Sequence, residues 1–437
     1  MSSRLKGTFP PDHLLRSIDR FVELGELRRE LAGFYSSIGR PSVDPELMIR
    51  MLLIGYCFGI RSERRLCEEV HLNLAYRWFC RLGLDGAVPD HSTFSKNRHG
   101  RFRESDLFRR VFETVLCRCI QERLVGGEGF AVDASLIKAD ANRQKGIEGD
   151  KGLPPEAAGR AIDEYLAVLD DAAFGAATEV TPKFVSPSDP AARWTGAHGG
   201  QAFFAYSTNY LIDTENAIII DVEATTAIRQ AEVLAARRML ERARDRFGLC
   251  PKRLLGDSAY GSAETLGWLV NQQGIEPHVT VFDRSTRTDG TFSREEFAYD
   301  AERDIYICPG GKPLSTIGTL VNDGATIFYR ASKHDCEGCA LKERCCPNTP
   351  ARRVPRSIHE GARDIARQIA TSWQGRVSRR LRKKVEMLFA HLKRILRLDR
   401  LRLRGPSGAR DEFILAATAQ NLRKLAKLIP LPIPTPA

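Results

Sequence analysis

The sequence predicts an α/β protein in which a helical N-terminal region precedes a core of strands and helices. Three observations lead to this fold class. Helix caps and apolar runs indicate mostly helical structure over residues 10–122, a short apolar run bounded by glycine begins at Gly129, and strand patterns then alternate with helix patterns. The chain has 437 residues, which is too long for one ordinary core, so two or three domains of roughly 100–200 residues are expected.

The N-terminal region is expected to be all helical. Asp44-Pro45-Glu46 supplies an N-cap, a proline at the first helical position and an acid in the first turn, ahead of an apolar run. The helices predicted here cover residues 44–60, 62–70, 72–81 and 104–123, with a turn and cap at 89–93.

The core is expected to begin with a buried strand over residues 129–134. The strand is followed along the chain by a hairpin (203–212 and 217–223), a helix (229–247), a strand (252–256), a helix (263–273), a strand (276–282) and a late helix (377–396). A polar insertion over residues 138–200, with one helix at 156–171, separates the first strand from the hairpin, and a final helix covers 411–428. The order of these elements matches a ribonuclease-H-like core.

Charge and hydropathy limit the class of partner. The formal net charge is +11, which favours an anionic partner such as nucleic acid or an acidic membrane face, although many soluble proteins are basic without such a role. No run approaches the roughly 18–20 apolar residues of a membrane span, and residues 1–11 lack the apolar core of a signal peptide. We therefore expect a cytoplasmic protein with reduced cysteines.

Three acids stand at corresponding places in this core. Asp133 lies on the first strand, Asp257 follows the fourth strand, and Glu386 lies on the late basic helix. Each has an ordinary alternative: a turn or cap residue for the aspartates, and for Glu386 a surface ion pair with Arg382 of roughly 0.3–0.5 kcal/mol. Together they predict one site, because clustered carboxylates need a cation such as Mg²⁺ or Mn²⁺ to offset their repulsion.

The segments around these acids resemble a known family. Three segments are similar to the catalytic segments of DDE transposases from bacterial insertion sequences. They are Asp133-Ala134-Ser135, Asp257-Ser258-Ala259-Tyr260-Gly261 and Arg382-x3-Glu386-x6-Lys393. The family signature has a tyrosine where this chain has Arg379. The resemblance implies that Asp133, Asp257 and Glu386 hold two Mg²⁺ or Mn²⁺ ions for phosphoryl transfer. It also implies that Arg382 and Lys393 contact DNA near the scissile phosphate.

The N-terminal helices resemble the N-terminal domain of the same transposase group, through residues 62–66 and 89–98. The second segment presents polar and basic side chains suited to phosphates and base edges in a major groove. The alternative is an ordinary solvated helix start. The predicted DNA-contacting residues are His91, Ser92, Thr93, Lys96 and Arg98.

A cysteine cluster lies in the polar stretch after the core strands. It consists of Cys308 followed by Cys336, Cys339 and Cys345, a spacing that allows four thiolates to bind one structural zinc ion. The chain also resembles related transposases, which carry such cysteines in the same insertion. A redox pair or unliganded cysteines is the alternative.

The resemblance implies a transposase that binds terminal inverted repeats and target DNA, acts as a homodimer and lies in the bacterial cytoplasm with the nucleoid. A metal-dependent nuclease without strand transfer, and an inactive transposase-derived DNA-binding protein, are the alternatives. The domain plan is a helical DNA-binding domain (10–122), a first catalytic part (126–282), a cysteine-bearing insertion (283–372), a second catalytic part (373–428) and a disordered tail (429–437).

Overall fold

The computed structural model describes residues 5, 7–34, 43–100, 102, 105–176, 178, 180–196, 200–282 and 287–431. The chain forms two compact units, which we describe separately: residues 1–251 with 380–437, and residues 252–379. Of the predicted tail, residues 432–437 lie outside the described residues. No described helix combines the length and the apolar character that crossing a bilayer requires. The predicted domain boundaries remain predictions.

The N-terminal part of the larger unit is helical, as predicted. Its helices are α2 (Leu14–Asp19), α3 (Gly25–Glu30), η1 (Leu31–Phe34), α4 (Pro45–Cys57), α5 (Glu63–Leu72), α6 (Leu74–Phe79), α7 (His91–His99) and α9 (Leu107–Gln121). The Asp44 side chain accepts a hydrogen bond from the backbone N–H of Glu46 at 3.0 Å, which confirms the predicted start of α4. Asp90 caps α7 in the same way.

An antiparallel sheet forms the centre of this unit. Strand β1 (Gly129–Lys138) pairs with β5 (Phe203–Asp213), and β5 pairs with β6 (Ile219–Thr226) and, at its start, with β4 (Arg193–Thr195). Helix α11 (Arg229–Phe247) covers one face, where Ser207 donates a hydrogen bond to Glu232 at 2.6 Å. Tyr210, three positions along β5, points to the opposite face, because strand side chains alternate.

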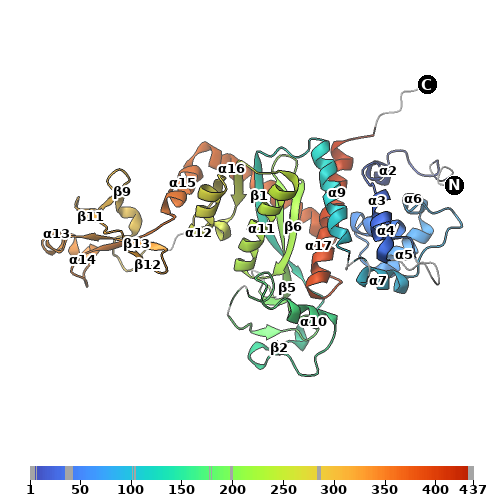
Figure 1. Cartoon of the computed structure of the whole chain (residues 1–437), viewed down its shortest axis with the longest axis horizontal. Helices are drawn as coiled ribbons and strands as arrows, with labels where there is room; N and C mark the ends of the chain where they lie inside the picture. The colour runs from blue at the N-terminus through green and yellow to red at the C-terminus, as the bar shows by residue number, and fades with distance from the viewer. Residues whose placement is uncertain are drawn as a thin grey trace. The chain divides into compact units, whose positions relative to one another are not determined.

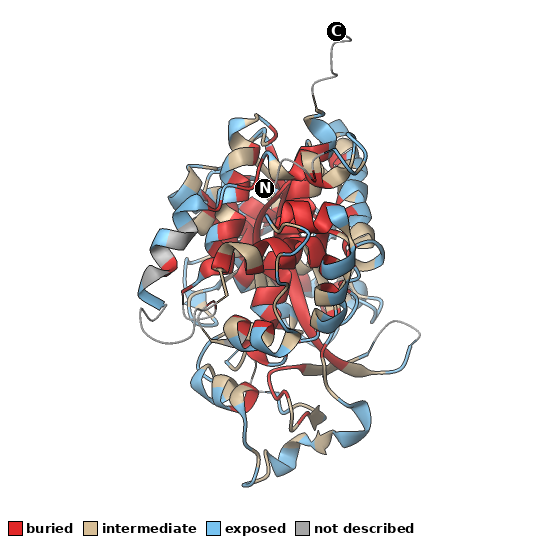
Figure 2. Cartoon of the chain, turned by 90° about the vertical axis from the view of Figure 1, so that its right-hand side faces the viewer, coloured by how far each residue is buried: buried red, intermediate tan, exposed pale blue. Residues whose placement is uncertain are grey.

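Helix α17 (Gly405–Leu428) is buried along most of its length and packs against β6, α9, α4 and α2 (Figure 1). The Asn421 side chain accepts a hydrogen bond from the N–H of Ile219 and donates one to its carbonyl oxygen, at 2.9 and 2.8 Å, which ties the helix to the start of β6. Buried positions gather in the central strands and helices, while the outer faces of helices are exposed (Figure 2).

The first insertion contains little regular structure. It holds η2 (Arg143–Lys145), β2 (Ile147–Glu148), η3 (Gly149–Lys151), α10 (Arg160–Ala167) and β3 (Phe184–Val185). The helix predicted over 156–171 is therefore shorter than expected. Glu164 of α10 accepts hydrogen bonds from the N–H and hydroxyl of Ser407, at 3.0 and 2.7 Å, and so caps the start of α17 from a distant part of the chain.

The smaller unit contains two parallel strands, β7 (Arg253–Gly256) and β8 (Glu276–Val279). Between them lie η4 (Ser258–Tyr260), α12 (Ala263–Gly267) and its continuation η5 (Trp268–Gln272). The same unit contains α15 (Glu360–Thr371) and the first residues of α16 (Trp373–Arg394), the basic helix, whose residues from Arg380 onward belong to the larger unit.

The stretch predicted as a polar insertion forms a second sheet within this unit. The sheet runs in the order β12-β13-β11-β10-β9, with β14 also paired to β13. Its elements are η6 (Arg294–Glu296), β9 (Ala298–Asp300), β10 (Ile305–Ile307), β11 (Pro313–Ser315), β12 (Leu320–Val321), β13 (Thr326–Ala331), α13 (Lys333–Glu337), α14 (Lys342–Cys345) and β14 (Arg353–Ser357). The chain is thus a mixed α/β protein with a helical N-terminus and a sheet-rich C-terminal region.

Candidate active site and nucleic-acid interface

Asp133 lies in the middle of β1, as predicted. It is half-buried beside the buried Val132, and one carboxylate oxygen accepts a hydrogen bond from the N–H of Ala134 at 2.9 Å. Its cross-strand neighbour is Tyr210 of β5. Because directly opposed residues of paired strands share one face of the sheet, Asp133 points to the face opposite α11.

The basic helix packs on the Asp133 face of the sheet. The ring of Phe389 on α16 lies against the ring of Tyr210, with centroids 5.5 Å apart. Glu386 stands one turn before Phe389 and is exposed. In the part of the chain that the structure describes, Glu386 makes neither a hydrogen bond nor an ion pair, so the surface ion pair with Arg382 is not formed.

The two basic residues predicted to hold DNA lie on the same helix. Arg382 and Lys393 are both half-buried. Burial lowers the pKa of Lys393, and the nearby Asp399 opposes this shift. The segment after α16 joins the sheet, since the N–H of Lys138 donates to the carbonyl oxygen of Asp399 at 3.3 Å. The end of β1 therefore fixes this segment relative to the strand that carries Asp133.

Asp257 follows β7 in the smaller unit and is half-buried. One of its carboxylate oxygens accepts a hydrogen bond from the N–H of Ala259 at 2.7 Å and caps η4. The capping alternative is therefore correct as a local description. It occupies only one of the two oxygens, so a second role for the same carboxylate is compatible with the cap.

The described residues contain no group of three or more His, Cys, Asp or Glu side chains arranged to hold a metal ion. The structure places Asp133 on the sheet face that receives the helix of Glu386, within one unit. Asp257 belongs to the other unit, and the three-acid metal site remains a prediction. Carboxylate oxygens are nevertheless the donors that Mg²⁺ and Mn²⁺ prefer.

Helix α7 presents part of the predicted DNA-contacting set to solvent. Ser92, Thr93 and Lys96 are exposed, and His91 is half-buried beside Asp90, 3.4 Å from its carboxylate. Arg98 differs from the prediction because its side chain is buried. It donates hydrogen bonds to the Tyr56 hydroxyl at 2.9 Å and to Glu63 at 3.2 Å, so it joins helices of the N-terminal part and does not reach the surface.

The predicted zinc cysteines lie around the second sheet. Backbone N–H groups of Lys312 and Leu341 donate to the sulfurs of Cys308 and Cys339, at 3.3 and 3.4 Å. Cys336 and Cys345 are buried in the core of this sheet, and burial raises the pKa of Cys345 to about 11. The zinc site stays a prediction from the spacing of the four cysteines.

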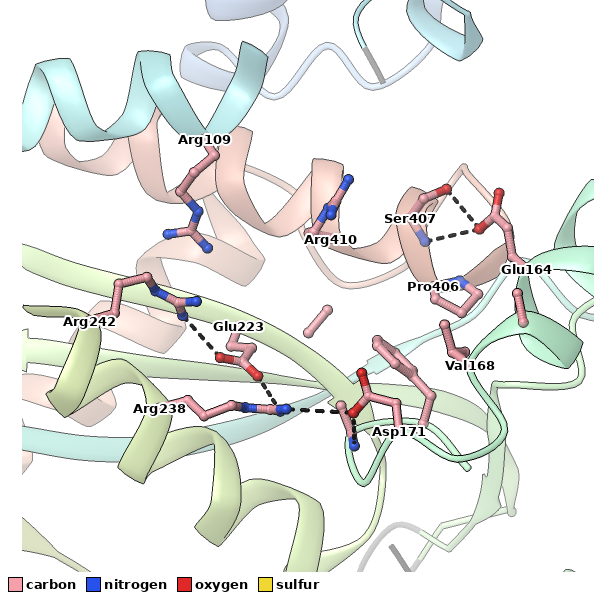
Figure 3. A pocket seen from close by; sticks show the side chains of 14 residues that line it. Arg109, Glu164, Val168, Asp171, Glu223, Arg238, Arg242, Pro406, Ser407 and Arg410 are labelled. Carbon is pink, nitrogen blue, oxygen red and sulfur yellow. Dashed lines mark hydrogen bonds and ion pairs between the residues drawn. The ribbon is translucent and has the colours of Figure 1, made fainter. Parts of the chain in front are cut away.

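Sequence reasoning missed a cavity of about 720 Å³ beside β6, lined by arginines from three helices (Figure 3). Acids of β6 pair with three of these arginines: Asp221 meets Arg109 and Arg242 at 2.6 Å each, and Glu223 pairs with Arg238 and Arg242. Burial raises the pKa of Glu223, although both of its arginine partners oppose this shift. The positive charge of the arginines in this cavity is therefore largely neutralised by acids of the same chain. Asp221 and Glu223, alternating in an apolar strand, were the available sequence signal.

Two family models match the chain. Residues 3–100 match a transposase domain (DUF772), and residues 307–426 match a transposase DDE domain. Glu386, Arg382 and Lys393 lie inside the second match, whereas Asp133 and Asp257 precede it. Among solved structures, the chain is similar to a piggyBac transposase in a synaptic complex with hairpin DNA. Identity is 12%, over 98% of this chain and 75% of that chain, with a TM-score of 0.33.

Proposed function

We propose that the chain is a DDE transposase, which binds the ends of an insertion sequence and catalyses metal-dependent DNA cleavage and strand transfer. The matches to a transposase domain over residues 3–100 and to a transposase DDE domain over residues 307–426 support this proposal. One observation carries the proposal furthest. Asp133 faces α16, the helix that bears Glu386 and the basic residues, through the contact of Phe389 with Tyr210.

We assign Asp133, Asp257 and Glu386 as the ligands of two Mg²⁺ or Mn²⁺ ions. Such ions, when bound, activate a water molecule or a 3′-hydroxyl and stabilise the leaving oxygen of an in-line phosphoryl displacement. The half-buried setting of Asp133 and the second oxygen of Asp257 suit this role. Glu386, exposed and without a partner among the described residues, is available to a ligand.

The remaining residues position the DNA. Arg382 and Lys393 bind the phosphodiester backbone near the reacting phosphate, because their positive charges lie on the helix that carries Glu386. Ser92, Thr93 and Lys96 on the exposed side of α7 contact the terminal repeat. Arg98, which is buried, is left out of this set.

We further propose that the strands belong to one ribonuclease-H-like core. Three antiparallel strands, β1, β5 and β6, are followed along the chain by α11 and then by the parallel pair β7 and β8. This succession is the one expected for that core. The DNA partners are terminal repeats and target DNA, and pairing two ends calls for a homodimer.

A strand-transfer assay tests the proposal. A DNA fragment bearing the element's end, a target plasmid and Mg²⁺ or Mn²⁺ should give joined product with the wild-type chain. Cleavage without joining would favour the metal-dependent nuclease. Binding without any cleavage would favour an inactive transposase-derived DNA-binding protein.

A further inference from the structure

A second cavity, of about 820 Å³, lies in the larger unit between α2, α16, α17 and the turn that joins β5 to β6. Four cationic side chains line it: Lys384 from α16 and Arg423, Lys424 and Lys427 from α17. Two exposed acids, Asp12 and Glu215, also line the cavity. We call this cavity the α16–α17 groove. Its excess of positive charge favours an anionic ligand.

The lysines of the α16–α17 groove have no acidic partner. Among the residues described, Lys384, Lys424 and Lys427 make no ion pair or hydrogen bond. This contrasts with the cavity beside β6, where Asp221 and Glu223 hold the neighbouring arginines. Positive charge that the chain does not neutralise is available to a ligand.

Two groups in the groove respond to this positive charge. The pKa of Lys424 is lowered by burial, then by Lys427 and Lys384. The pKa of His391 is lowered by burial and then by Arg423, so its imidazole is neutral at pH 7. The lysines and Arg423 therefore carry the charge, and a bound anion would relieve their mutual repulsion.

We propose that the α16–α17 groove binds the phosphodiester backbone of duplex DNA, as a site separate from Arg382 and Lys393. The inference rests on the proposed function, because the transposase domains make DNA the favoured anion over an acidic protein segment. From Gln420 to Lys427 the helix rises about 10 Å, which matches about three nucleotides of one strand at roughly 3.4 Å each. Lysines act as point charges on phosphates, so binding here is independent of base sequence.

The test uses the full chain with Lys424→Ala/Lys427→Ala and, separately, Lys384→Ala. Binding to a fluorescein-labelled duplex of random sequence is measured by anisotropy in EDTA, over a range of salt concentrations. Each lysine that neutralises a phosphate contributes about 1 to the magnitude of the slope of log K against log salt. The magnitude of this slope should therefore fall by about 2 in Lys424→Ala/Lys427→Ala and by about 1 in Lys384→Ala. A second duplex of unrelated sequence should give the same losses.

The matched control is Arg229→Ala/Arg244→Ala, which removes two exposed charges from α11 on the opposite face of the sheet. Its slope should equal that of the wild type, and melting curves establish that all variants fold. An unchanged salt slope in Lys424→Ala/Lys427→Ala would overturn the proposal. This is also the result expected if the groove binds an acidic protein segment and not DNA. Cleavage by the wild type in Mn²⁺ is scored separately. DNA binding through the groove without cleavage would contradict the proposed enzyme and leave the groove standing.

Discussion

Phe389 of α16 packs on Tyr210 of β5, with ring centroids 5.5 Å apart and ring planes inclined at 55°. Tyr210 is buried and stands directly across the sheet from Asp133. Phe389 in turn stands one turn after Glu386. One aromatic contact therefore connects the strand of the first acid with the helix of the third, and it makes Phe389 a positioning residue for the proposed site.

Phe389→Ala should lower metal-dependent cleavage and leave DNA binding at moderate salt nearly unchanged. Phe389 is half-buried, so its truncation should cost about 2 kcal/mol of unfolding free energy, less than the roughly 3–5 kcal/mol of a fully buried phenylalanine. If the ring positions α16, the Mn²⁺ concentration for half-maximal cleavage should rise, and Phe389→Tyr should restore it. Equal metal dependence in Phe389→Ala and wild type would reduce the contact to simple packing.

Asp257→Asn and Asp133→Asn should each abolish cleavage in Mg²⁺ and Mn²⁺ while retaining binding to the element's end. Asparagine keeps the side-chain oxygen that can accept the Ala259 N–H, so the cap of η4 should survive in Asp257→Asn. The charge that a divalent ion requires is removed. Cleavage is measured on end-containing DNA, and binding by gel shift in EDTA. Lost folding together with lost binding would instead show that the aspartate serves only as a cap.

Local signals in the sequence predicted the regular elements well. The cap at Asp44 and the apolar spacing of α11 depend on neighbouring residues alone, and the predicted bounds of α11, 229–247, are those observed. Elements held by distant residues were harder to predict. Helix α17 begins at Gly405 and not at 411. Pro406 stands in its first turn, and the N–H of Ser407 donates to Glu164 of α10, which is distant in sequence.

The second sheet was missed for the same physical reason. Its strands are two to six residues long, and pairs such as Tyr329 with Val354 join residues far apart in sequence, so no periodic pattern develops within one strand. Of the candidate site, motif spacing could supply the residues, but the orientation of a side chain depends on packing. Arg98 lies on the expected helix and points inward to Tyr56.

Glu412→Gln should destabilise the larger unit by about 3–5 kcal/mol, because it removes one member of a buried ion pair. One Glu412 oxygen accepts hydrogen bonds from the N–H groups of Arg402 and Leu403 at 2.6 Å each, and the other meets Arg61. Denaturant unfolding measures the loss. The matched control is Glu69→Gln, which breaks the exposed pair with Arg65 and should cost about 0.5 kcal/mol or less. Equal losses in the two variants would contradict a special role for the buried pair.

The stability of the larger unit should depend on the protonation of Asp189. This carboxyl is fully buried, accepts a hydrogen bond from the Tyr206 hydroxyl, and has its pKa raised by burial to about 6. Because the folded pKa lies above the ordinary value of 3.8, the contribution is fully present below about pH 4 and is lost as pH rises through about 6. The loss amounts to about 3 kcal/mol.

Asp189→Asn removes this titration while keeping an acceptor for Tyr206. Its unfolding free energy should therefore gain about 3 kcal/mol relative to wild type when the pH is raised from 4 to 7, measured from urea unfolding at each pH. Asp163→Asn, an exposed acid on α10, controls for the loss of one carboxylate and should follow the wild type across this range. If Asp189→Asn and wild type differ by the same unfolding free energy at both pH values, Asp189 is already ionised in the folded chain at pH 4. Tyr206 would then donate to a carboxylate at both pH values.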